Sequence, residues 1–141
     1  VLALAGENGY PYAVPMSFVY DEEERRLLFH TARVGHKMTG IERCDKASFC
    51  VIAEDAVVPS RFTTYYRSVI VFGRLRVLTS DEEKRRTAEL LGEAYYPDHP
   101  EACDAEIKKY WPAFNMVELK IEHMTGKKSK ELLQEEASAE P

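Results

Sequence analysis

The segment Phe29–Lys37, with the sequence FHTARVGHK, has residue types that suit phosphate binding. A predicted strand ends here, Gly35 gives the backbone room, and a predicted helix begins with Lys37 in its first turn. The unpaired N–H groups of a helix start, together with a lysine, can bind a phosphate dianion, and Thr31 adds a hydroxyl donor. An ordinary strand-to-helix turn with a solvated lysine has the same pattern, so both interpretations remain open.

A second segment, Thr63–Val69 with the sequence TTYYRSV, places hydroxyl groups and a guanidinium at the start of a long predicted strand. Arg67 and Ser68 are adjacent, and both can reach a phosphate if the strand bends at this end. The alternative is a sheet edge rich in Tyr and Thr, which are good strand formers in any case. Taken alone, this segment favours the alternative.

A third segment, Val14-Pro15-Met16-Ser17, interrupts an otherwise regular strand pattern. Proline cannot donate a ladder hydrogen bond, so neighbouring backbone groups are left unpaired. An extended backbone of this kind can offer its N–H and C=O groups to the edge of a planar ring. An edge strand protected against aggregation explains the proline equally well.

The other chemically capable side chains give weaker signals. His30, His36, His99 and His123 are scattered without an i, i+4 pair, so we expect no metal site. Trp111 could stack on a ring or anchor a partner subunit, although a packing role also fits an indole.

The composition restricts the class of protein. The chain has 141 residues and a net charge of -5, which predicts one folded domain and argues against a general nucleic-acid or anionic-membrane binder. No apolar run approaches the roughly 20 residues that span a bilayer. Three cysteines without a close pair favour a reducing cytoplasm over a disulfide framework.

Hydrophobic periodicity predicts the elements that would position these segments. Strands are expected at 11–20, 26–32, 47–53, 63–78 and 115–123. Helices are expected at 36–44, from a capping box at Ser80–Glu83 to near Pro97, and from Pro100 through Trp111. The near-continuous apolar run at 47–53 predicts a strand buried on both faces.

The order of these elements favours hairpin-like connections. We therefore predict a mainly β fold, an antiparallel barrel with helices packed outside, because a doubly wound parallel sheet would need regular β-α alternation. We expect one domain over residues 1–127. Residues 128–141 form a charged tail that we expect to be loose or to pair with something outside the domain.

Taken together, four segments resemble the FMN-binding split-barrel family, the pyridoxamine 5'-phosphate oxidase-like proteins, and most closely its nitroimidazole-resistance branch. They occur in the family's order and cover nearly the whole chain. The segments are Tyr12–Tyr20, Leu28–Lys37, Tyr65–Gly73 and Val117–Lys127.

The resemblance implies a six-stranded antiparallel split β-barrel with flanking helices. Such a barrel would form a homodimer, with one FMN in each of two clefts at the subunit interface. The isoalloxazine would lie along Val14–Ser17, and the phosphate would be held by His36 and Lys37. The full set of implied FMN contacts is Val14, Pro15, Met16, Ser17, His30, Thr31, His36, Lys37, Arg67, Ser68 and, from the partner subunit, Trp111 or Phe114.

The function that follows from the resemblance is that of an FMN-dependent oxidoreductase. It would take hydride from NAD(P)H and reduce a small-molecule electron acceptor such as a nitroaromatic or a quinone. His30 is the candidate catalytic proton donor, because histidine can supply a proton near neutral pH. The alternatives are a non-enzymatic flavin-binding or sensor protein, and the same barrel holding deazaflavin or haem, with His123 or His36 as the axial ligand.

Overall fold

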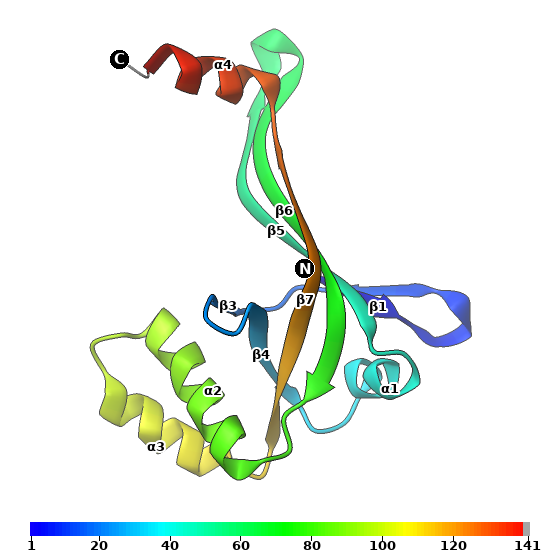
Figure 1. Cartoon of the computed structure of the whole chain (residues 1–141), viewed down its shortest axis with the longest axis vertical. Coiled ribbons are helices and arrows are strands. Elements are labelled where there is room, and N and C mark those ends of the chain that lie inside the picture. The colour runs from blue at the N-terminus through cyan, green and yellow to red at the C-terminus, as the bar shows by residue number, and fades with distance from the viewer. Residues whose placement is uncertain (140–141) are drawn as a thin grey trace.

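The computed structural model describes residues 1–139, except for the side chains of residues 135, 136 and 139. The described chain is β-rich and contains seven strands and four α-helices (Figure 1). The strands are β1 Leu2–Ala5, β2 Pro11–Val14, β3 Val19–Asp21, β4 Arg26–Ala32, β5 Lys46–Val58, β6 Thr63–Val77 and β7 Phe114–Lys128. The helices are α1 His36–Arg43, α2 Asp81–Tyr95, α3 Pro100–Tyr110 and α4 Lys130–Ala139, with short 3₁₀ turns at Glu7–Gly9 and Pro59–Arg61.

All strand pairs described are antiparallel, as predicted, and the order across the sheet is β2-β1-β5-β6-β7-β4-β3. The described sheet therefore has seven strands, not six, and β2 and β3 are its edges. The sheet is strongly curled. Phe29 of β4 and Phe49 of β5 have ring centroids 6.2 Å apart, although two strands lie between them in the ladder and a flat sheet would separate them by about 14 Å.

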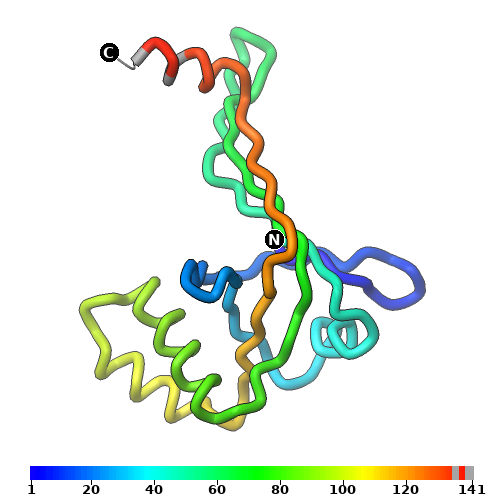
Figure 2. Tube along the Cα trace, in the orientation of Figure 1, coloured from blue at the N-terminus to red at the C-terminus, as the bar shows by residue number. Residues whose placement is uncertain are grey.

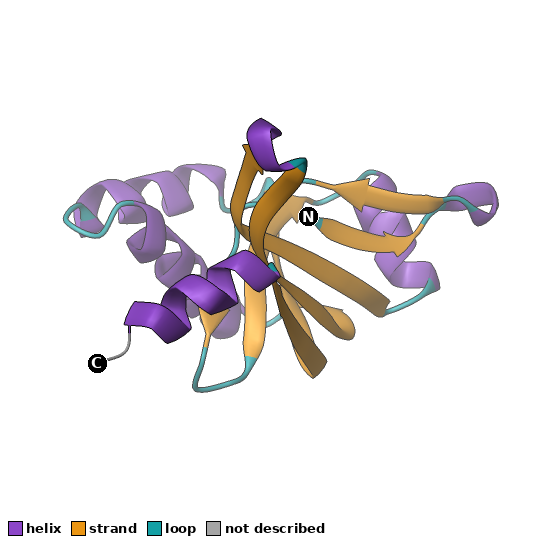
Figure 3. Ribbon diagram, turned by 90° about the horizontal axis from the view of Figure 1, so that it is seen from above, coloured by secondary structure: helices purple, strands orange, loops and turns teal. Residues whose placement is uncertain are grey.

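The curled sheet is covered on both faces at one end. The core inside the curl is formed by buried apolar side chains, among them Leu2, Leu27, Phe29, Met38, Ile41, Phe49, Val71, Leu75 and Leu119. The opposite face of β4 and β7 is covered by α2 and α3 around a second buried cluster that contains Leu28, Leu91, Ile107 and Met116. Seen from above, α2 and α3 lie on one side of the sheet, and α1 lies on the other (Figure 3).

Three strands run on beyond this body. We call residues 50–72 of β5 and β6, together with residues 123–128 of β7, the arm. It extends away from the helices and carries α4 near its far end (Figure 1). The first residue of the chain lies at the base of the arm (Figure 2), where Val1 and Cys50 exchange hydrogen bonds of 2.6 and 2.8 Å.

A buried ionic network attaches α2 to the sheet. Arg26 of β4 binds Asp21 at 2.9 Å and Glu118 of β7 at 2.8 Å, and the three side chains are almost fully buried. Arg76 of β6 binds Glu118 at 2.7 Å and Glu83 of α2 at 2.6 Å. As the sequence predicts, Ser80 caps α2 by accepting a hydrogen bond from the N–H of Glu83. The start of α2 is therefore fixed by both charge and capping.

The structure confirms the predicted helices at α1, α2 and α3 and corrects four other expectations. The strand predicted at 11–20 is two short strands, because Pro15 breaks the ladder. Leu2–Ala5 is a strand that the sequence pattern did not indicate. The run 47–53 is not buried on both faces, since Ile52 is 61% exposed. The tail, expected to be loose or to pair with something outside the domain, is helical from Lys130 to Ala139, and the division into a domain and a tail stays a prediction.

Candidate functional site

The break between β2 and β3 exposes a stretch of unpaired backbone. Val14 is paired with Leu2 and Val19 with Leu28, but the structure describes no backbone hydrogen bond for residues 15–17. Met16 nevertheless packs against the main core, so residues 14–17, which we call the β2 segment, are held close to the body rather than projecting from it. Its peptide groups are available to a ligand, as the position of Pro15 predicts.

The start of α1 lies beside this segment. Gly35 precedes the helix with φ 121°, a conformation that side chains rarely adopt, so glycine is required at this position. Thr39 donates the first helical hydrogen bond to Gly35, so the N–H groups before it have no partner within the helix. The ring of His36 lies 6.1 Å from that of Tyr12 on β2, which joins the helix start to the strand that leads into the break.

The two candidate residues on β4 lie on opposite faces of the sheet. Thr31 is buried on the same face as Phe29, opposite Asn115. His30 is exposed on the other face, paired with Met116, whose side chain belongs to the cluster under α2 and α3. The structure therefore brings Thr31, but not His30, to the core face with the β2 segment.

Arg67 and Ser68 lie in the arm, away from the start of α1 within one chain. The ladder puts Val14 at the level of Leu2, Phe49 and Val71. Ser68 lies three residues before Val71 in β6, about 10 Å farther out along the arm, and β6 is three strand spacings away from β2. Arg67 pairs with Glu54 at 2.9 Å. The structure thus separates this pair from Lys37 in a single protomer.

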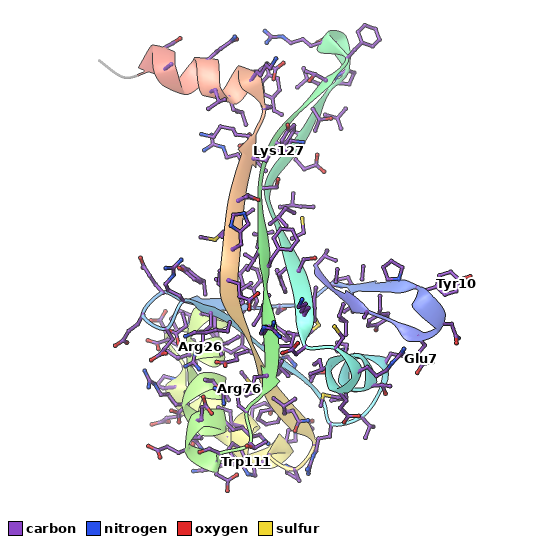
Figure 4. The ribbon with its side chains drawn as sticks, turned by 45° about the vertical axis from the view of Figure 1, so that its right-hand side comes forward. Glu7, Tyr10, Arg26, Arg76, Trp111 and Lys127 are labelled. Atoms are coloured by element: carbon purple, nitrogen blue, oxygen red, sulfur yellow. The ribbon has the colours of Figure 1, made fainter. Side chains whose placement is uncertain are left out.

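The register adds a cation that the sequence analysis missed. Lys127 of β7 lies directly opposite Ser68, and its Nζ is 5.2 Å from the centre of the Tyr66 ring. The only sequence signal is the Gly126-Lys127 pair near the end of the last strand, and nothing local relates it to Ser68. Figure 4 shows Lys127 on the arm and Trp111 at the opposite end of the molecule.

Trp111 follows α3 and is held in the corner between α2 and β7. Its ring makes an edge contact with Phe114 at 6.0 Å, and Lys84 lies 4.2 Å over it while donating to the Trp111 carbonyl at 2.7 Å. Burial, followed by the positive charge of Arg33, lowers the pKa of Lys84. Within its own chain Trp111 therefore packs against the second cluster and does not approach the β2 segment.

The hollows near the candidate site are small or open. A pocket of about 90 Å³ is lined by Tyr12, His36 and Gly40, below the 300–1,000 Å³ typical of ligand pockets. A wider hollow of about 450 Å³ adjoins it at Tyr10 and extends over Ser48 and Phe72. A single protomer can therefore contact a ligand through the β2 segment and the start of α1, but it does not enclose the ligand.

Comparison with known proteins agrees with this architecture. The family model described as pyridoxamine 5'-phosphate oxidase matches residues 1–128. A search of curated proteins found no significant match. No helix among residues 1–139 is long and apolar enough to cross a membrane.

Solved structures show the same fold at low sequence identity. A candidate 5-nitroimidazole antibiotic resistance protein from Bacteroides thetaiotaomicron is 21% identical, with a TM-score of 0.69 over 89% of this chain and 73% of that one. The conserved hypothetical protein Rv2991 from Mycobacterium tuberculosis is 17% identical, with a TM-score of 0.76 over 93% and 77%. An FAD and haem binding protein from Mycobacterium smegmatis is 22% identical, with a TM-score of 0.69 over 99% and 71%.

The curled antiparallel sheet and the match over residues 1–128 define a flavin-binding class of protein. The chain belongs to the pyridoxamine 5'-phosphate oxidase-like split-barrel family, whose members bind flavins and include flavin-dependent oxidases.

Proposed function

We propose that this protein binds FMN through the β2–β3 break and the start of α1. The observation that carries the proposal is that the backbone of residues 15–17, for which the structure describes no hydrogen bond, lies close to the start of α1, where Lys37 stands in the first turn. The isoalloxazine edge would meet the peptide groups of Val14–Ser17. The phosphate would accept hydrogen bonds from the first N–H groups of α1 and from Lys37. Thr31 would lie near the ribityl chain.

A net-acidic chain can hold a phosphate if its cations are local to it. Gly35 lets the chain turn without a side chain over the helix start, and His36 and Lys37 follow at once. No acidic residue lies in the first turn of α1, in contrast to α2 and its three acidic residues. The helix dipole and the lysine therefore act on a bound phosphate without local repulsion.

We further propose that a second copy completes the cleft and closes the split barrel. The pocket beside His36 is too small for a flavin, so one wall must come from elsewhere. The face of the arm that carries Phe72 also holds Ile52, Ile70, Ser68 and Lys127, since paired residues share a face of the sheet. Exposed Ile52 and Phe72 on this face suit a homodimer interface. Ser68 would then serve the partner's flavin, whereas Arg67 lies on the other face of β6, and the contacts expected from Arg67 and Trp111 stay predictions.

The proposed reaction is NAD(P)H-linked reduction of a small electrophile such as a nitroaromatic or a quinone. Bound flavin supplies the hydride and electron transfer. The protein orients the ring through the β2 segment and leaves the cleft open to small molecules. His30 lies on the opposite face of β4 from Thr31, so the geometry of one chain does not support the proton-donor role expected for it. The nitroimidazole-resistance relative supports this substrate class, and the three free cysteines fit a cytoplasmic location.

The test is turnover by the FMN-loaded protein. NADH and NADPH are each mixed anaerobically with a nitroimidazole or a quinone, and nicotinamide oxidation is followed by absorbance. Acceptor-dependent oxidation supports the reductase. Stable FMN binding without any oxidation would point instead to the non-enzymatic flavin-binding or sensor protein.

The spectrum of the loaded protein separates the remaining cofactor alternatives. A flavin, a deazaflavin and a haem have distinct visible absorption. A haem would need an axial ligand. His36 lies at the candidate phosphate site, whereas His123 is exposed in the arm with its ring 6.3 Å from that of Phe72.

A further inference from the structure

The last residue of α2 is hydrogen-bonded to the β2–β3 break. The hydroxyl of Tyr95 accepts a hydrogen bond from the N–H of Phe18 and donates one to the carbonyl of Phe18, both at 3.0 Å. A phenolic hydroxyl can do both at once, because it has one proton and two lone pairs. The two residues are 77 positions apart in the sequence.

These bonds replace a missing strand partner. At one end of the break, Val14 is held by its pairing with Leu2. At the other end, Phe18 lies outside any strand, and Tyr95 satisfies both of its backbone groups. The Phe18 ring makes an edge contact with Phe49 at 4.9 Å, so its side chain and its backbone are both fixed. Residues 15–17, which have no strand partner in the described structure, are therefore fixed at both ends, by Val14 and by Phe18.

The helix that carries Tyr95 is itself anchored. Its first turn is attached to the sheet through the ion pair of Glu83 with Arg76, and Ser80 caps it. Between its first turn and Tyr95, the helix packs against the body through the buried side chains of Thr87, Ala88 and Leu91. Through Tyr95, this well-packed helix fixes the position of residues 15–17, which have no strand-pairing hydrogen bonds.

We propose that Tyr95 is a positioning residue for the candidate flavin site. It holds the backbone of residues 15–17 in the position that would present N–H and C=O groups to the edge of the isoalloxazine. The identity of the ligand rests on the proposed function, whereas the clamp on Phe18 does not. Loss of the hydroxyl should loosen the segment, weaken flavin binding and alter the environment of the ring.

The chain supplies a matched control in the adjacent residue. Tyr96 is 53% exposed, close to the 58% of Tyr95, and its ring stacks on His99 with centroids 3.7 Å apart. Among the described residues, no hydrogen bond involves the Tyr96 hydroxyl. Tyr95→Phe and Tyr96→Phe each remove one phenolic oxygen from a half-exposed ring, but only the first removes bonds to the break.

The experiment compares full-length wild type, Tyr95→Phe and Tyr96→Phe in two measurements. The first is amide hydrogen exchange of the FMN-free proteins, in which Tyr95→Phe should accelerate exchange at Phe18 and Tyr96→Phe should not. The second is FMN titration with the visible spectrum of the bound flavin. Tyr95→Phe should weaken binding about threefold to tenfold and shift the flavin absorption, because two hydrogen bonds that order the site are lost.

Unchanged exchange at Phe18 in Tyr95→Phe overturns the clamp itself. Faster exchange with wild-type FMN affinity and an unshifted spectrum overturns the positioning role and leaves Tyr95 as a structural contact. If the wild type takes up no FMN, the proposed function fails and the flavin role fails with it, while exchange at Phe18 still decides whether the clamp exists.

Discussion

The two ends of β6 and β7 lie in different surroundings. In the body, Leu75 and Leu119 are buried inside the curled sheet, and Met116 is buried on the opposite face under α2 and α3. In the arm, Phe72 of β6 is 46% exposed, and Ile52 of the neighbouring strand β5 is 61% exposed. The same strands thus have both faces covered at one end and an apolar face open at the other.

The charges differ in the same way. In the body, Glu118 is almost fully buried and its charge is balanced by Arg26 and Arg76. In the arm, the pair of Arg67 with Glu54 is partly exposed. The body therefore satisfies its own apolar and charged groups, whereas the arm has the surface of an element that meets something else. The difference supports the proposal that stability resides in the body and that the arm meets a second copy.

The largest predicted effect is on the ionic network of the body. Glu118→Ala removes the buried carboxylate that Arg26 and Arg76 share, leaves the buried Arg26 with Asp21 as its near partner, and should lower the free energy of unfolding by about 3 kcal/mol. Glu54→Ala in the arm should lower it by about 1 kcal/mol or less, because that pair is solvent-screened. Urea denaturation measures both, and equal losses in the two variants would show that body and arm do not differ as described.

A smaller effect is expected at the candidate phosphate site. Lys37→Ala should weaken FMN binding about 10- to 100-fold, because a charge-assisted hydrogen bond to the phosphate is lost. Lys108→Ala, in an exposed helical pair with Asp104 on α3, serves as the control and should leave FMN affinity unchanged. Flavin fluorescence titration measures both. Unaltered affinity in Lys37→Ala would remove the phosphate assignment.

The arm is tested through the oligomeric state. Phe72→Glu should weaken the proposed dimer at least about tenfold, because a charge would be buried against an apolar partner surface. Tyr110→Glu on α3 is the matched control, since Phe72 and Tyr110 are both 46% exposed. Sedimentation velocity over a concentration series distinguishes them. A wild type that stays monomeric, or a dimer equally sensitive to both changes, contradicts the role given to the arm.

The smallest effect is a dependence of stability on acid. Burial alone would raise the pKa of Asp21 and of Glu118, but hydrogen bonds from arginines outweigh it and lower both values, and Arg76 lowers the pKa of Glu83. Because these pKa values are lower in the folded than in the unfolded protein, their contribution is complete above about pH 4.5 and declines as the pH falls further.

Denaturation at a series of pH values checks this sign. The wild type should lose stability progressively below about pH 4.5, and Glu118→Gln, which has one ionisable group fewer in the network, should show a shallower decline. A wild-type stability that is flat or rises toward acid would mean that the network does not hold these carboxylates in their charged form.

Local sequence signals predicted the elements well and their long-range pairing poorly. The capping box at Ser80 and the apolar spacing after His36 lie within one helical turn or two, so the sequence predicts α1 and α2 directly. Leu2–Ala5 escaped because a four-residue strand with two alanines gives little periodic signal. The helix at Lys130–Ala139 escaped because its charged composition resembles that of a loose tail.

The candidate site shows the same limit. The β2 segment and the start of α1 were predicted from Pro15 and from Gly35 with Lys37, and the structure places them side by side. Neither the register that sets Lys127 opposite Ser68 nor the bond between Tyr95 and Phe18 could be predicted, since each joins residues more than fifty positions apart. Curling of the sheet and packing of α2 determine those contacts, and neither leaves a local pattern.

The central claim is that this chain binds FMN at the β2–β3 break and the start of α1. Titration of the purified protein with FMN, read by visible absorbance and flavin fluorescence, tests it most directly. We expect saturable, equimolar uptake with a changed flavin spectrum, and weaker uptake by Lys37→Ala. A colourless protein that takes up no FMN at any concentration tested would contradict it.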